Sequence, residues 1–175
     1  MDKKPTSPGA KALVISLIMI VVSMGIYFAG TRISSALNYL TYGILLIGII
    51  FSINQYAKEI QYRATFGNYF AHGFKVAAVV ALIMIGYLLI FLFAFPEFKE
   101  KALVEIREEM LADKNSTPDQ VEQGMEMVRK GFMLFAVGGS LLYYLLVGVI
   151  AALIGAAITK KKNDDFTRNI NQTGS

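Results

Sequence analysis

The sequence predicts an all-α fold: an integral membrane bundle of four transmembrane helices, with an extracytoplasmic amphipathic helical hairpin between the third and the fourth helix. The main observation is that residues 12–31, 33–57, 76–96 and 131–159 contain no Asp, Glu, Lys or Arg. Each run reaches the roughly 20 residues that a helix needs to cross a hydrocarbon core of about 30 Å. Charged residues lie between the runs, because a charge at the bilayer centre costs about 2.5–3.5 kcal/mol on the insertion scale.

The distribution of charge predicts the orientation of these helices. Residues 1–11, Arg32, residues 58–75 and residues 160–175 each carry a net positive charge, whereas residues 97–130 carry six basic and nine acidic side chains. Basic residues beside membrane helices favour the cytoplasmic side. We therefore expect both termini and the middle connector to be cytoplasmic, and the acidic connector to lie outside.

Composition excludes several classes of function. Four spans and their connectors occupy nearly all of the 175 residues, which leaves no separate soluble catalytic domain. The chain has no Cys, so it contains no disulfide, Cys-based metal site or thiol nucleophile. The pI of about 9.2 reflects the flanking charges, since no basic surface interleaved with aromatic residues indicates nucleic-acid binding.

The expected order of segments follows from these runs and from their turn residues. Residues 1–10 form a disordered cytoplasmic leader, residues 11–162 a single membrane domain, and residues 163–175 a disordered cytoplasmic tail. Within the domain we expect spans at about 12–31, 36–57, 75–95 and 132–159, with the third ending or kinking at Pro96.

Residues 98–130 predict the outer helical hairpin. Its first half has apolar residues every three or four positions, opposite a face of glutamates. Its second half begins with Thr117 as N-cap, Pro118 at the first helical position and Gln120 three residues after the cap. We expect the two apolar stripes to face each other or to rest on the membrane surface.

The fourth span has a row of small residues that predicts close helix packing. Membrane helices associate where small side chains let the backbones approach, because lipid tails are as apolar as Leu. We expect this face to pack inside the bundle or against a partner; its residues are Ala136, Ser140, Gly148, Ala152, Gly155 and Ala156.

The connector of residues 58–75 mixes aromatic and basic side chains. An ordinary interfacial loop explains this composition, and the alternative is a specific lipid-headgroup site. The candidate headgroup contacts are Lys58, Arg63, His72 and Lys75.

The residues that membrane enzymes and pumps require are absent from the four charge-free runs. A proton relay, an ion pump or a voltage sensor usually contains ionisable residues within its spans. His72, the single histidine, has no second ligand at metal-binding spacing. We find no nucleophile elbow or phosphate loop. We therefore expect no enzyme, no metal and no cofactor.

Several segments resemble a bacterial family of uncharacterised four-span inner-membrane proteins whose common domain has no known function. The similar features are Arg63 to Gly73 with Gly67, Phe95-Pro96-Glu97, the helix start from Thr117 to Glu122, and the final Lys160-Lys161-Lys162. The likeness covers about residues 10–162. It implies a four-helix architecture without catalytic residues, and an accessory membrane subunit linked to polyprenyl-phosphate or envelope glycan metabolism.

Two hypotheses about function follow. The first is a non-enzymatic accessory or scaffold subunit, whose partners are the lipid bilayer and either a membrane protein or a second copy of this chain. The alternative is a passive binder or pathway for a lipid or a small neutral solute. A water-accessible cavity between helices would favour the alternative, and a solid bundle would favour the scaffold.

Overall fold

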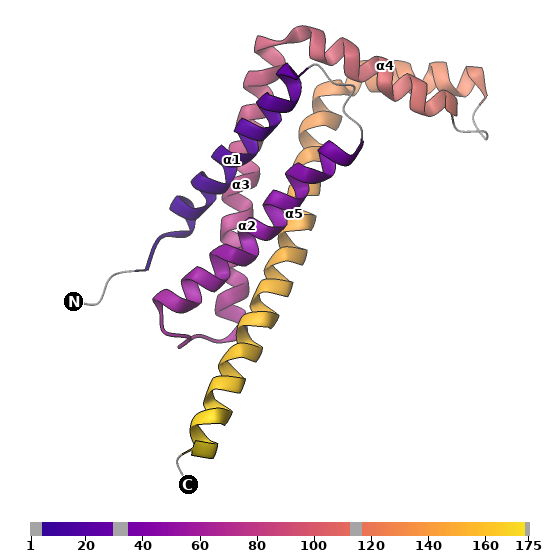
Figure 1. Ribbon diagram of the computed structural model, residues 1–175. Helices are drawn as coiled ribbons and strands as arrows, with labels where there is room; N and C mark the ends of the chain where they lie inside the picture. Colours follow the sequence, from indigo (N-terminus) through magenta and orange to yellow (C-terminus); the bar gives the residue numbers. More distant parts are fainter. Residues whose placement is uncertain (1–4, 30–34, 113–116, 174–175) are drawn as a thin grey trace. The chain divides into compact units, whose positions relative to one another are not determined.

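The computed structural model describes residues 5–29, 35–112 and 117–173. These residues form five helices and no strand: α1 (Pro8–Phe28), α2 (Ser35–Glu59), α3 (Phe66–Ala94), α4 (Pro96–Ala112) and α5 (Pro118–Thr173) (Figure 1). α1, α2, α3 and residues 118–159 of α5 are long and apolar enough to cross a membrane. The predicted all-α class with four membrane helices is confirmed.

The helices begin where the local sequence provides caps. The Ser7 hydroxyl accepts a hydrogen bond from the Ala10 amide at 3.2 Å, and Pro8 occupies the first position of α1. At the start of α5, the Thr117 amide donates to the Gln120 side chain at 3.0 Å, and the Gln120 amide donates to the Thr117 hydroxyl at 3.4 Å. The predicted capping box is therefore confirmed.

The helix ends differ from the expected spans in α1, α3 and α5. α1 begins at Pro8, within the segment expected as a disordered leader. α3 begins at Phe66, about nine residues before the expected start, which leaves a connection of only residues 60–65. Gln61 and Tyr62 adopt positive φ there, at 55° and 58°. α5 runs without a break from Pro118 to Thr173, so it includes the second half of the hairpin and continues where a disordered tail was expected. No proline follows Pro118, so no residue in this stretch removes a helical hydrogen bond.

The chain divides into two units: residues 1–84 with 143–175, and residues 85–142. In the first unit α1 and α2 run antiparallel and in contact (Figure 1). Its core takes side chains from four helices, including Met19 of α1, Ile49 of α2, Val80 of α3 and Ala152 of α5, all fully buried.

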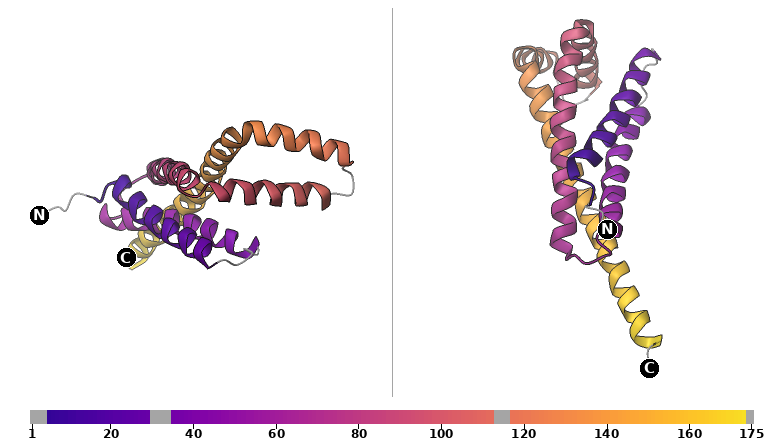
Figure 2. Two further views of the ribbon diagram at one scale, coloured as in Figure 1. Left: turned by 90° about the horizontal axis from the view of Figure 1, so that it is seen from above. Right: turned by 90° about the vertical axis from the view of Figure 1, so that its left-hand side faces the viewer.

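The second unit contains the hairpin. α4 and the first part of α5 lie side by side and antiparallel (Figure 2). Their apolar stripes face each other, with Leu103 of α4 and Val121, Met125 and Phe132 of α5 buried together with Leu92 of α3. The structure thus selects the first of the two predicted arrangements.

Candidate functional site

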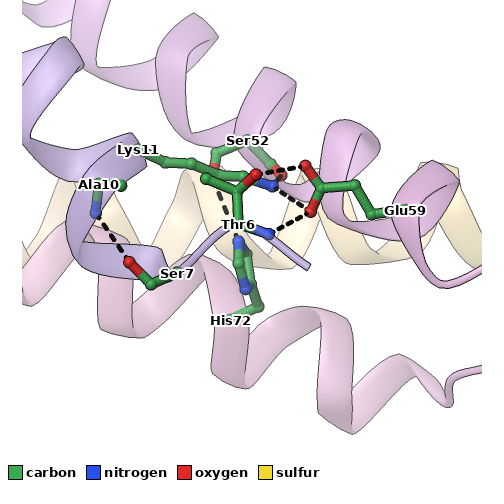
Figure 3. Close-up of polar contacts among 7 residues, drawn as sticks. All are labelled: Thr6, Ser7, Ala10, Lys11, Ser52, Glu59 and His72. Atoms are coloured by element: carbon green, nitrogen blue, oxygen red, sulfur yellow. Dashed lines mark hydrogen bonds and ion pairs between the residues drawn. The ribbon is translucent and has the colours of Figure 1, made fainter. Parts of the chain in front are cut away.

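A network of polar side chains joins α1, α2 and α3 at one end of the first unit (Figure 3). Lys11 lies near the start of α1, and its side chain is only 5% exposed. Its ammonium nitrogen is 3.1 Å from a carboxylate oxygen of Glu59, the last residue of α2, whose side chain is 21% exposed. A buried charge is tolerated when it is paired and hydrogen-bonded. This contact therefore holds the beginning of α1 against the last turn of α2.

Further hydrogen bonds extend the network on both sides of the ion pair. The amide and the hydroxyl of Thr6 donate to the two Glu59 oxygens at 3.0 and 2.9 Å. Lys11 also donates to the main-chain carbonyl of Ser52 at 3.5 Å. The Ser52 hydroxyl lies 3.3 Å from His72 Nε2, which brings in α3. The Glu59 carboxylate therefore accepts three hydrogen bonds: one from the Lys11 ammonium and two from Thr6.

Aromatic rings pack against His72 and Lys11 of this network. The His72 and Tyr56 rings are stacked, with centroids 4.1 Å apart and an interplanar angle of 4°. Tyr69, which is fully buried, meets Tyr56 edge to face at 6.3 Å. The Lys11 ammonium lies 5.9 Å from the Tyr56 ring centre, within the range of a cation–π contact.

Of the four candidate headgroup contacts, three are exposed and one is buried. Lys58, Arg63 and Lys75 are exposed, whereas His72 is 6% exposed and hydrogen-bonded to Ser52. His72 lies on the inner face because α3 begins at Phe66, which places residues 69, 72, 76 and 80 on one buried side of a helix. The sequence also shows this spacing. Because the charge-free run begins only at residue 76, residues 69 and 72 were assigned to the connector and not to the helix.

No sequence pattern marked Lys11, Tyr56 or Glu59 as members of a site. Lys11 and Glu59 mark the edges of charge-free runs, so they were interpreted only as flanking charges. In the structure Lys11, Glu59 and His72 belong to helices that are candidate membrane spans. All three lie just outside the charge-free runs, in the turns by which the helices extend beyond them.

The small-residue row of α5 is divided between the two units. In the first unit a Cβ added to Gly148 would collide with the Ala77 side chain, and one on Gly155 would lie 2.7 Å from Ile53 Cδ1 and 3.3 Å from the backbone of Ile50. Ala152 and Ala156 are fully buried on the same face.

In the second unit Ala136 is half-buried against the hairpin core, and Ser140 is half-buried.

A groove of about 600 Å³ lies between α1 and α2, beside the polar network. Its walls are mostly apolar, and Lys11 and Ser52 line its polar end. The lining residues are Thr6, Ala10, Lys11, Val14, Ile15, Ile18, Ile44, Ile47, Gly48, Phe51, Ser52 and Gln55. Its volume lies within the roughly 300–1,000 Å³ of small-molecule sites.

The network has no feature of a metal centre. In the part of the chain that the structure describes, no group of three or more His, Cys, Asp or Glu side chains could hold a metal ion. The network neutralises the buried charge of Lys11 and joins three helices. It also offers hydrogen-bond donors at the end of an apolar groove.

Four long apolar helices, together with this site at the end of the first unit, define a multi-pass helical membrane protein. The chain belongs to the family described as "Protein of unknown function (DUF4199)", which matches residues 11–161. No curated protein and no solved structure matches the chain.

Proposed function

We propose that this chain is a non-enzymatic accessory or scaffold subunit of the bacterial inner membrane, which holds a membrane protein partner. In this proposal both termini and the α2–α3 connection are cytoplasmic, and α4 with the start of α5 is outside. The positive charge beside the cytoplasmic ends supports this orientation. A link to polyprenyl-phosphate or envelope glycan metabolism is part of the proposal and rests on the family resemblance alone.

The observation that carries the proposal is the closed core of the hairpin. Leu103, Val121 and Met125 bury their side chains within the hairpin itself, so its apolar stripes need no membrane surface to cover them. Its outward faces carry charged side chains, with exposed ion pairs such as Arg107–Glu122 at 3.4 Å. A folded unit of this kind, with charged outer faces, is suited to binding a protein.

Three apolar side chains on the hairpin remain outside its core: Val104, Leu111 and Met127 are 57%, 53% and 65% exposed. A few side chains that a partner buries at the centre of an interface contribute most of the binding energy. Replacing all three with Ser should reduce partner binding and leave the hairpin core intact.

The test is to purify the tagged full-length chain from its native membrane in nanodiscs and to identify stoichiometric proteins by mass spectrometry. We expect a companion protein, or a second copy of this chain, that is retained by the wild type. The triple Ser variant should lose it. A matched control replaces Leu13, Leu17 and Val21 of α1, which are exposed outside the hairpin, and should retain it. Recovery of the chain alone, as a monomer, would contradict the proposal.

The second candidate is a passive binder for a lipid or a small neutral solute. The groove between α1 and α2 favours it, because its volume of about 600 Å³ leaves room for a ligand between two helices. Apolar walls with a few polar groups at one end suit an amphiphile better than a polar solute.

A further inference from the structure

The groove between α1 and α2 has the length of one bilayer leaflet. Along α2 its lining extends from Ile44 to Gln55. At 1.5 Å per residue this distance is about 16 Å, close to half of the roughly 30 Å hydrocarbon core. The polar end lies where α1 begins and α2 ends, which is the depth at which a helix leaves the hydrocarbon.

The walls of the groove are open to the bilayer. Val14, Ile18, Ile47 and Phe51 line it and are 56%, 48%, 67% and 65% exposed. In a helix pair that spans the membrane, such a groove opens on hydrocarbon, where acyl chains are the apolar groups available to fill it. Ile15 and Gly48 close its floor, with the Ile15 side chain 3.0 Å from the position of a Cβ on Gly48.

The polar end offers donors to an anionic headgroup. Lys11 is 93% buried, lines the groove and has three N–H donors, of which two have acceptors in Glu59 and Ser52. The remaining one has no hydrogen-bond acceptor among the residues that the structure describes. Because Glu59 neutralises Lys11, a further positive charge near this end is supplied by Lys58, an exposed residue one turn beyond Gln55.

We propose that this groove binds one acyl chain of an anionic phospholipid, with its phosphate at the polar end that Lys11 and Gln55 line, one helical turn before Lys58. Apolar contacts along Val14, Ile18, Ile47 and Phe51 hold the chain, and the basic side chains select the headgroup. The proposal rests on the second candidate function and names the ligand class for it. It does not depend on a protein partner.

The test uses the full-length chain in phosphatidylcholine nanodiscs that contain a small fraction of phosphatidylglycerol with a photoactivatable acyl chain. Cross-linked peptides should map to residues 10–18 and 44–55. Ile18→Trp, which fills the groove, should reduce cross-linking at residues 44–55 about tenfold. The matched control is Leu17→Trp, because Leu17 is 57% exposed on the same helix but does not line the groove. It should leave the labelling unchanged.

The headgroup is tested with two probes of identical chains, phosphatidylglycerol and phosphatidylcholine. Lys58→Gln should lower the phosphatidylglycerol signal severalfold and leave the phosphatidylcholine signal unchanged. Lys130→Gln removes an exposed lysine of the hairpin, in the other unit of the chain, and should change neither.

Two results would overturn the proposal. Equal labelling of Ile18→Trp and Leu17→Trp at residues 44–55 would mean that only surrounding bilayer lipid is detected. Equal labelling by both probes, with no effect of Lys58→Gln, would remove the anionic selectivity. Neither result bears on partner capture through the hairpin, so the two proposals fail separately.

Discussion

Lys11 and Glu59 form an ion pair at 3.1 Å between the beginning of α1 and the last residue of α2, although 48 residues separate them. The pair lies at the end of the apolar groove and is joined to α3 through Ser52 and His72. One contact therefore connects the packing of three helices with the polar end of the proposed lipid site.

Breaking this pair should destabilise the first unit. Lys11→Met leaves the partly exposed Glu59 carboxylate with only its Thr6 donors, and we expect a loss of about 1–2 kcal/mol in the free energy of unfolding. The double variant Lys11→Met with Glu59→Gln should recover most of it. Denaturation in mixed micelles, followed by circular dichroism, measures both. Equal stability of the wild type and the single variant would show that the pair is too solvated to matter.

The small residues of α5 should not tolerate enlargement where they meet α2 and α3. Gly148→Leu would place four carbons where a Cβ already collides with Ala77, and Ala152→Leu enlarges a fully buried position. Overpacking of this kind costs about 1–3 kcal/mol or more.

Ala157→Leu is the control for these two variants, because Ala157 is exposed on the same helix. We expect lower yields of folded protein by size-exclusion chromatography for the first two and a normal yield for the third. Normal yields for all three would refute the packing of this face.

Two methionines of the hairpin should differ sharply in their importance. Met125→Ala removes a side chain that is 1% exposed in the hairpin core and should cost about 2–5 kcal/mol. Met127→Ala changes a side chain that is 65% exposed and should cost less than about 0.5 kcal/mol. Hydrogen exchange of the α4 amides reports the difference locally. Similar protection in both variants would mean that the two stripes do not pack on each other.

The orientation of the chain can be tested with single cysteines, because the natural sequence has none. Cysteines at positions 115 and 163 should react with a membrane-impermeant maleimide from opposite sides, the first in intact cells and the second only after lysis. Labelling of both positions from one side would contradict the proposed topology.

The fold class, the end of α3 before Pro96 and the helix starts at Ser7 and Thr117 follow from local sequence signals. Charge-free runs of about 20 residues can only be accommodated as membrane helices, and the caps at Ser7 and Thr117 act within one turn of chain. These signals are local, so they can be read without knowing which helix meets which.

The tertiary structure decided everything that depends on two distant segments. It placed Lys11 against Glu59, turned His72 inward onto Tyr56, and brought the apolar stripes of α4 and α5 together. It also left the groove between α1 and α2. The physical reason is that a flanking charge or an apolar stripe has the same sequence pattern whether it faces lipid, water or another helix, and only packing selects among them.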